Sequence, residues 1–491
     1  MFKKYTTTLV AQVLIYFSGF LLIPVIVKTS GTEVYGEYVV IISLLGILAN
    51  ISSFGVGFSA KRFLPSIDDV ENRAIAFYPQ FYFHTLSSIF LGIVVLLFYP
   101  SIDEYFLGGV GSIDKFLIIL YLVFYTLYSQ VSNIFRYTHK VNLFNISTIL
   151  YPYIFLVVVL LWYRLDNIIS LNVLIISQIV ALAAIFVSLL APSIKSIGFK
   201  LTWYNKYNFI KDIKYGFPLI IVVIFELIIS VSDRYVIAAF MDLDSVAFYA
   251  IAYSVGSIPF IFPKVIGIIL PPIMSKLKDK GGKDKIALMI NSALFIFCMI
   301  IFPFTIGVIM LGDPLLSLYT NKETAAAAAG LLPIITMAIF FYGVGSILSS
   351  ILFVDMKTKS IFLANSVAGL LNLIANIVIF SIINDIYVAA WTTFCSYFLY
   401  MVLIYSQINK EYVIKLLNIK IVKIALSSFI MAMALYFIKS LNFDFYTIEG
   451  LVFGVVIGCV VYIGSLFVSR AIVYKDILLL IGKNSIELES E

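Results

Sequence analysis

The sequence predicts an all-α polytopic membrane protein, and two observations support that fold class. Hydrophobic residues make up 62% of the chain and charged residues only 12%, whereas a soluble domain carries about 25% charged residues. Apolar runs recur from one end of the chain to the other, and about 20 apolar residues suffice to cross a bilayer as a helix. The chain is therefore expected to cross a membrane many times.

About fourteen transmembrane helices are expected from these runs. Each run has about 18 to 28 residues, which at a rise of about 1.5 Å per residue spans the hydrocarbon core. The predicted spans lie near residues 9–27, 38–57, 77–99, 116–134, 144–163, 170–191, 216–240, 247–270, 286–311, 326–353, 361–382, 386–407, 421–438 and 448–468.

Lys and Arg residues are distributed unevenly between the segments that join the spans. If the N-terminus is cytoplasmic, 26 of the 33 Lys and Arg residues fall in cytoplasmic segments and 5 in outer segments. The other two, Arg234 and Lys264, lie within spans. Cytoplasmic loops of membrane proteins carry an excess of these residues. With an even number of spans, both termini are then predicted to be cytoplasmic.

A short internal repeat indicates how the spans are grouped. Residues 33–38 (EVYGEY) follow the first span, and residues 244–249 (DSVAFY) follow the seventh. Six helices separate them, and an even number restores orientation, so the two halves would be parallel repeats about an axis along the membrane normal. We expect one six-helix lobe over residues 1–191 and a second over residues 216–408, joined by a linker along the membrane surface at residues 192–215. Two further helices are expected within residues 409–468, followed by a cytoplasmic tail at residues 469–491.

The seventh span carries three charged residues, Glu226, Asp233 and Arg234. A charge at the centre of a membrane helix costs roughly 2.5–3.5 kcal/mol and usually marks a functional site. At 100° per residue, Glu226, Ser230 and Asp233 form one polar stripe, and Arg234 lies about 80° away from it. Two interpretations are possible: the stripe lines a cavity, or it packs inside the helix bundle with Asp233 beside a cation of another helix. Three charges in one span favour the cavity.

The eleventh span places three amides on one helix face, those of Asn365, Asn372 and Asn376. Hydrogen bonds to neighbouring helices would explain this arrangement. The same amides offer donors and acceptors that suit sugar hydroxyls. Both interpretations stay open.

The eighth span carries Lys264, together with Pro259 and Pro263, which permit a kink. By helical rise Lys264 lies about 22 Å from the outer turn and therefore within the membrane. It either extends to the cytoplasmic interface or binds an anion.

Cofactor, metal and nucleic-acid chemistry find no support in the sequence. Cys298, Cys395 and Cys459 are widely spaced and lie in apolar runs, and His84 and His139 are far apart. Neither a disulfide framework nor a metal site is indicated. No catalytic constellation stands out, so we expect no enzyme. The net charge of +6 reflects orientation in the membrane rather than a nucleic-acid partner.

Several short motifs resemble those of one transporter family. The frame IPVIVKTSGTEVYGEY at residues 23–38 resembles the opening of bacterial polysaccharide repeat-unit flippases (Wzx-type), of the multidrug/oligosaccharidyl-lipid/polysaccharide (MOP) exporter superfamily. Asp233, Arg234 and Tyr249 resemble the start of that family's second lobe, and Pro271, Pro272 and Ser275 resemble the end of its eighth span. Length, span count and layout agree over nearly the whole chain.

The resemblance implies a flippase for undecaprenyl-pyrophosphate-linked oligosaccharide, the repeat unit of O-antigen or capsule. Such a protein moves its substrate from the cytoplasmic to the periplasmic leaflet of the bacterial inner membrane. The family is V-shaped and similar to MATE transporters, it alternates access between its lobes, and ion-coupled antiport with a proton or sodium ion is proposed for it. Its implied partners are membrane lipids and the polymerase and chain-length proteins of the pathway.

The polar residues of the spans are consistent with that implication. A sugar hydroxyl placed in hydrocarbon without a partner costs roughly 4–8 kcal/mol, so an oligosaccharide needs a polar path. The three asparagines of the eleventh span are candidates for that path. Arg234 and Lys264 are candidate partners of the pyrophosphate. Glu226 and Asp233 are candidates for binding the coupling ion, because burial raises the pKa of a carboxyl group.

Two other functions stay open. A drug or cation antiporter of the same superfamily would share the fold, but an acidic residue among the first spans, which would favour it, is not found. A membrane polysaccharide polymerase commonly carries a large outer loop, and the predicted outer loops are short.

Overall fold

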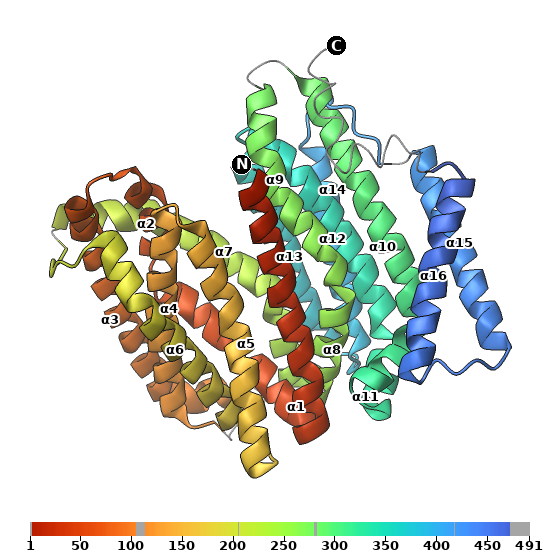
Figure 1. The fold of residues 1–491 in the computed structure, drawn as a ribbon, viewed down its shortest axis with the longest axis horizontal. Coiled ribbons are helices and arrows are strands. Elements are labelled where there is room, and N and C mark those ends of the chain that lie inside the picture. Colours follow the sequence, from red (N-terminus) through yellow and green to blue (C-terminus); the bar gives the residue numbers. More distant parts are fainter. Residues whose placement is uncertain (1, 105–112, 205, 279–281, 417, 472–491) are drawn as a thin grey trace. The chain divides into compact units, whose positions relative to one another are not determined.

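The computed structural model describes residues 2–104, 113–204, 206–278, 282–416 and 418–471. Within these ranges, only the backbone is described for residues 2–9, 206, 207, 222, 226, 228 and 229. Every regular element within these ranges is a helix (Figure 1). The chain divides by its contacts into two compact units. The first unit comprises Met1–Ile251 and Asn365–Thr392, and the second comprises Ala252–Ala364 and Thr393–Glu491.

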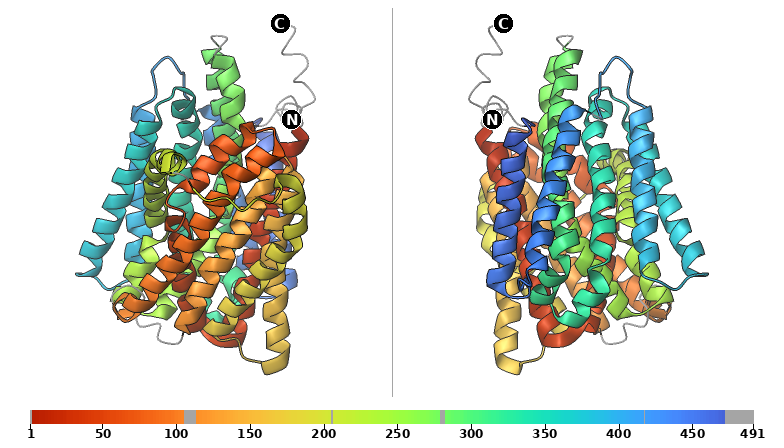
Figure 2. Two further views of the ribbon diagram at one scale, coloured as in Figure 1. Left: turned by 90° about the vertical axis from the view of Figure 1, so that its left-hand side faces the viewer. Right: turned by 90° about the vertical axis from the view of Figure 1, so that its right-hand side faces the viewer.

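The first unit contains the N-terminal helices, α7, the beginning of α8, most of α13 and the beginning of α14. Their bounds are α1 (Phe2–Ile51), α2 (Val56–Phe63), η1 (Leu64–Ser66), α3 (Val70–Ile102), α4 (Lys115–Tyr137), α5 (Val141–Asp166), α6 (Leu171–Ile197), α7 (Lys206–Phe240), α8 (Leu243–Gly256), α13 (Thr358–Phe380) and α14 (Tyr387–Ser406). Helix α4 packs against α3, α5 and α6, and these helices run alongside one another (Figure 2).

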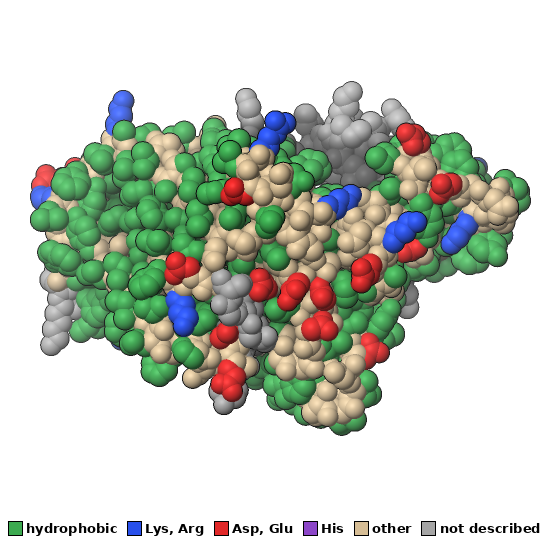
Figure 3. All heavy atoms as spheres, turned by 90° about the horizontal axis from the view of Figure 1, so that it is seen from below, with side chains coloured by type: hydrophobic (Ala, Val, Ile, Leu, Met, Phe, Trp, Pro, Cys, Tyr) green, Lys and Arg blue, Asp and Glu red, His purple; other side chains and the backbone are tan. Residues whose placement is uncertain are grey.

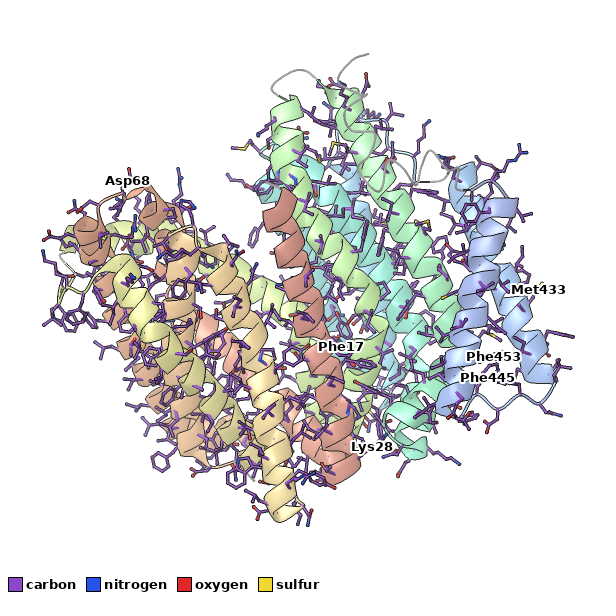
Figure 4. All side chains as sticks on the ribbon, viewed as in Figure 1. Phe17, Lys28, Asp68, Met433, Phe445 and Phe453 are labelled. Atoms are coloured by element: carbon purple, nitrogen blue, oxygen red, sulfur yellow. The ribbon has the colours of Figure 1, made fainter. Side chains whose placement is uncertain are left out.

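The second unit is built around α10. It contains η3 (Ile258–Phe260), α9 (Ile261–Lys278), α10 (Lys283–Tyr319), α11 (Lys322–Ala328), α12 (Leu331–Val354), α15 (Ile419–Ser440) and α16 (Ile448–Val468). Helix α10 packs against α12, α15 and α16. Phe445 and Leu435 are buried in the cluster that joins α10 to the last two helices, whereas Met433 of α15 is 60% exposed and points away from them (Figure 4).

The number of membrane spans agrees with the sequence. Twelve helices of the described residues are long and apolar enough to cross a membrane, and the two parts of α7, Asn208–Phe225 and Ser230–Phe240, make a thirteenth span if counted together. Helix α1 is two helices merged across a kink, and its 50 residues are far too long for one crossing. Counting α1 as two spans gives the fourteen that the sequence predicts, and the all-helical fold is confirmed.

The kink in α1 lies at Gly31, in the predicted outer turn. Gly31 has a φ of 90° and a ψ of 173°, a conformation that is essentially restricted to glycine. The ribbon of α1 reverses direction at its lower end (Figure 1). The glycine therefore separates the first predicted span from the second.

The two repeated turns of the sequence contact each other in the first unit. Thr32 donates a hydrogen bond from Oγ1 to Oδ1 of Asp244 at 2.5 Å. A Cβ atom on Gly36 would lie 1.9 Å from the carbonyl oxygen of Leu243, so only glycine fits at this position. The six-plus-six grouping of spans, with the boundaries given above, stays a prediction.

The charges at the helix ends bear on the orientation that the sequence predicts. Figure 3 views the molecule from below, and acidic side chains are more frequent than basic ones on that face. Lys28, one of the few predicted outer cations, lies towards this end of the first unit (Figure 4). The assignment of this face to the periplasm stays a prediction.

Candidate functional site: the Asp233 cluster

The carboxylate of Asp233 is buried within the first unit and accepts hydrogen bonds on both oxygens. The residue is only 4% exposed. Its Oδ2 accepts from the hydroxyl of Tyr249 at 2.7 Å, and its Oδ1 accepts from Nδ2 of Asn376 at 2.7 Å. Two neutral donors thus stabilise the charged form of a side chain that would be costly to bury without them.

A second layer of polar groups holds Asn376 in place. The hydroxyl of Thr392 donates to Oδ1 of Asn376 at 2.6 Å, and Nδ2 of Asn376 lies 3.3 Å from Oδ1 of Asn372. Asn372 and Asn376 are 2% and 0% exposed. We call Asp233, Tyr249, Asn372, Asn376 and Thr392 the Asp233 cluster; it joins α7, α8, α13 and α14.

The Asp233 cluster brings one carboxylate together with neutral side-chain oxygens. The side-chain oxygens of Asn372, Asn376 and Thr392 lie in the hydrogen-bonded network that holds the carboxylate. Carboxylate, amide and hydroxyl oxygens are hard ligands, which favour protons and hard cations over soft metals. The cluster is therefore suited to taking up a single small positive charge.

Arg234 faces a different neighbour from Asp233, as the helical spacing predicts. Its Nη1 donates to Oγ of Ser43 at 3.0 Å, and Ser43 in turn donates to the carbonyl of Val39 at 2.7 Å. Adjacent residues of a helix point about 100° apart, so Asp233 meets α13 while Arg234 meets the second half of α1. The prediction that these two side chains diverge is confirmed.

The other residues predicted for the site are not joined to the cluster by the hydrogen bonds described above. Asn365 is half-buried on α13, seven positions before Asn372 and thus about 10 Å away by helical rise. Lys264 is exposed on α9 and belongs to the second unit. The side chain of Glu226 lies outside the described residues.

The polar stripe predicted for α7 stays a prediction, because the side chain of Glu226 lies outside the described residues. Ser230 is exposed and donates to the carbonyl of Leu227 at 3.0 Å, while Asp233 is buried. The two parts of α7 meet at an angle of 52° between Phe225 and Ser230. The angular spacing of Glu226 and Asp233 was calculated for one straight helix, and a bend changes that spacing.

Tyr249 and Thr392 belong to the cluster but were not among the predicted site residues. Tyr249 closes the repeated motif of residues 244–249 and also belongs to the resemblance at the start of the second lobe, and these were the signals that singled it out. Thr392 lies in an apolar span beside Thr393 and four positions before Ser396, and this polar pattern was not singled out. Both are found only once α8 and α14 are placed against α7 and α13.

Comparison with known protein families places the chain among polysaccharide biosynthesis proteins. The model of the family described as "Polysaccharide biosynthesis protein" matches residues 1–278, which is more than half of the chain. The MatE family model matches residues 218–378. No curated protein matches the chain.

Solved structures of transporters share its fold. A lipid II flippase, MurJ, in an inward closed conformation, is 20% identical with a TM-score of 0.76, covering 97% of this chain and 100% of its own. An inward-facing MATE family multidrug resistance transporter of the MOP superfamily is 13% identical with a TM-score of 0.61, covering 89% and 96%. The MATE multidrug transporter DinF-BH is 14% identical with a TM-score of 0.56, covering 82% and 94%.

The extent of the family match and the likeness of fold lead to the same assignment. The matched residues include the frame at residues 23–38 and the charged part of α7. The solved structures that share the fold are flippases or transporters rather than enzymes. This chain belongs to the polysaccharide biosynthesis protein family and has the fold of the MOP superfamily.

Proposed function

We propose that this protein is a flippase that moves an undecaprenyl-pyrophosphate-linked oligosaccharide from the cytoplasmic to the periplasmic leaflet of the bacterial inner membrane. Its membership of the polysaccharide biosynthesis protein family supports a role in making surface polysaccharide. A fold shared with a protein described as a lipid II flippase supports a lipid-linked substrate. The repeat unit of O-antigen or capsule is the substrate of this class.

The observation that carries the proposal is the Asp233 cluster. A charged group within a membrane-spanning helix is costly and is retained where it serves transport. Here Asp233 of α7 is joined by hydrogen bonds to a network of side chains from three other helices, α8, α13 and α14. We assign Asp233 as the site at which a coupling proton or sodium ion binds, with Glu226 as a second candidate.

Within this function the polar residues divide into three groups. Arg234 and Lys264 are the proposed partners of the pyrophosphate, because guanidinium and ammonium groups form the strongest hydrogen bonds to phosphate oxygens. Asn365, which is half-buried, is the proposed contact for sugar hydroxyls. The buried Asn372 and Asn376 are better assigned to holding the carboxylate of Asp233 than to binding sugar.

The cellular setting follows from the same proposal. Both termini lie in the cytoplasm, as the distribution of Lys and Arg predicts. The polymerase and chain-length proteins that use the flipped repeat unit are the expected protein partners, and membrane lipids surround the apolar helices.

Complementation tests the function. A bacterial strain that lacks its own flippase accumulates lipid-linked repeat units on the cytoplasmic side, and this protein is expected to restore surface polysaccharide. The variant Asp233→Asn should fail to restore it at equal expression. Asp385→Asn, which alters an exposed carboxylate, should behave as wild type. Normal polysaccharide with Asp233→Asn would exclude the proposed coupling role.

A multidrug or cation antiporter is the second candidate. The match of the MatE family model to residues 218–378 favours it. That range contains every residue of the Asp233 cluster except Thr392. Drug resistance in the complemented strain, without restored polysaccharide, would support this candidate over a flippase.

A further inference from the structure

A second buried carboxylate, that of Asp212, lies in the first unit near the beginning of α7. Asp212 is 7% exposed and falls within the predicted linker of residues 192–215. Its Oδ1 accepts a hydrogen bond from the hydroxyl of Ser59. Its Oδ2 accepts from Nε2 of Gln80 at 3.0 Å and from the hydroxyl of Tyr204 at 2.9 Å. We call these four residues the Asp212 cluster; it joins α2, α3, α7 and the segment before α7.

Two glycines bring Ser59 and Asp212 together. A Cβ atom on Gly55 would lie 2.2 Å from the carbonyl carbon of Gly216, and one on Gly216 would lie 2.0 Å from the carbonyl oxygen of Gly55. The backbones of the two segments are therefore in direct contact. Gly55 also has a φ of 86°, which favours glycine. Ser59 and Asp212 each lie four residues, about one helical turn, from this contact, and they meet there.

The segment before α7 rests on α3, which positions Tyr204. The ring centroids of Tyr82 and Trp203 are 5.1 Å apart, and those of Phe83 and Tyr204 are 6.2 Å apart. Helix α3 also carries Gln80, so one helix places both the amide and the phenol beside Asp212. Burial, and then the charge of Asp212, raise the pKa of Tyr204, so its hydroxyl stays a neutral donor.

The charge of Asp212 is not matched by a neighbouring cation. Among the described residues, no Lys or Arg forms an ion pair with it. Lys211 is next to it in sequence, but its Nζ lies over the ring of Phe63, 4.5 Å from the centroid. The three donors to Asp212 are neutral. A buried carboxylate without a countercharge is costly, and this cost favours the uptake of a positive charge.

The amide oxygen of Gln80 is the second sign of a ligand. Gln80 is 6% exposed, and within the described part of the chain its Oε1 has no hydrogen-bond partner. Oε1 and Nε2 are bonded to the same carbon, and Nε2 contacts Asp212, so Oε1 also lies close to the carboxylate. Buried polar atoms are rarely left without a partner. A cation held between this oxygen and the carboxylate would satisfy both.

We propose that the Asp212 cluster binds one sodium ion. Its ligands would be the carboxylate of Asp212, Oε1 of Gln80 and the hydroxyl oxygens of Ser59 and Tyr204. These are hard oxygen ligands, and a hydroxyl keeps lone pairs for a cation while its hydrogen rotates away. The site shares no residue with the Asp233 cluster, and the inference does not rest on the proposed substrate.

A monovalent cation suits the cluster better than a divalent one. The site has a single carboxylate, so sodium would neutralise it, whereas a divalent ion would leave a buried positive charge. The described residues hold no group of three or more His, Cys, Asp or Glu side chains that could bind a metal ion. The bound sodium ion would tie the beginning of α7 to α2 and α3.

Binding of radioactive sodium to the purified full chain tests this inference. Scintillation proximity measures the binding in detergent, with choline chloride holding the ionic strength constant. All variants are made in an Asp233→Asn background, which removes the carboxylate of the other candidate cation site. This parent protein should show saturable sodium binding, and adding Asp212→Asn should remove one bound sodium ion per protein. Equal binding by the two proteins, or none by the parent, would overturn the inference.

Gln80→Met separates a ligand from a structural donor. Methionine has a similar size but lacks both amide atoms. If Gln80 only donates to Asp212, its loss frees the carboxylate, and sodium should bind as well as before or better. If Oε1 is a ligand, affinity should fall at least about tenfold, since even the outer partners of a metal site contribute about 10–100-fold. Unchanged or tighter binding would contradict the proposed site, and this variant decides the question if Asp212→Asn does not fold.

Two controls define the specificity of the site. Asp68→Asn alters an exposed carboxylate at the same end of the unit (Figure 4) and should bind sodium as the parent does. An equal loss with Asp68→Asn would show that the effect is one of general surface charge and would overturn the inference. Unlabelled sodium should displace the labelled ion at lower concentration than calcium does. Stronger displacement by calcium would contradict the monovalent assignment.

Discussion

At the scale of single residues, Asp233 and Arg234 show how two neighbours in one helix acquire different roles. Asp233 is held by Tyr249 and Asn376, whereas Arg234 donates to Ser43. Neutral donors hold the carboxylate of Asp233, and such donors can reorganise when a cation arrives. This makes Asp233 the residue at which ion binding and helix packing are linked.

Tyr249→Phe tests the cost of removing one donor from the cluster. The tyrosine is buried, and phenylalanine has nearly the same volume, so the change leaves Oδ2 of Asp233 without this hydrogen bond and creates no cavity. We expect a loss of about 1–3 kcal/mol in stability, seen as a lower midpoint of thermal unfolding in detergent. Tyr405→Phe, at a side chain 45% exposed, is the control. Equal midpoints for both variants would show that the hydrogen bond contributes nothing.

Thr392→Val tests the second layer of the same cluster. The hydroxyl of Thr392 fixes Oδ1 of Asn376, and valine retains the shape without the donor. We expect a smaller loss of stability, about 0.5–1.5 kcal/mol. We also expect a larger loss of transport, since the orientation of the Asn376 amide is no longer fixed. Parallel unfolding and complementation measurements separate these effects; unchanged transport would remove Thr392 from the site.

The residues of the site were only partly predictable. Helical spacing predicts that Asp233 and Arg234 diverge, and that Asn372 and Asn376 share a face. It cannot predict which helix that face meets, because the partner is set by contacts distant in sequence. Tyr249 and Thr392 are such partners, and neither carries a charge that would reveal it.

At the scale of elements, α1 and α7 both depart from a straight helix, and only one departure is visible in the sequence. Gly31 marks the kink of α1, because its backbone conformation requires glycine. The 52° angle in α7 lies between Phe225 and Ser230, while its one proline is Pro218. Apolar periodicity therefore predicts both spans of α1 but not the bend of α7.

Gly36→Ala tests the contact between the repeated turns. A Cβ atom there would overlap the carbonyl oxygen of Leu243, so α1 or the turn before α8 must shift. Overpacking of this kind costs about 1–3 kcal/mol, and the amount of folded protein after purification should fall. Gly46→Ala is a matched control on the same helix, since a Cβ atom added there would have no neighbouring atom within 4 Å. Equal yields for the two variants would mean that the turns separate freely.

At the scale of the whole molecule, the distribution of charge predicts the orientation in the membrane. Exposed positions 68 and 385 are predicted to lie on opposite sides. In a background with the three native cysteines replaced by serine, Asp385→Cys should react with an impermeant maleimide in spheroplasts. Asp68→Cys should react only after the membrane is permeabilised. The reverse pattern would invert the predicted topology.

The most direct measurement of the central claim is transport by the purified protein in liposomes, with proton or sodium gradients imposed separately. Wild type should flip a lipid-linked oligosaccharide faster under one of these gradients. Asp233→Asn should fold but lose the response to that gradient. If Asp233→Asn flips the substrate at the wild-type rate under every gradient, the Asp233 cluster is not the coupling site.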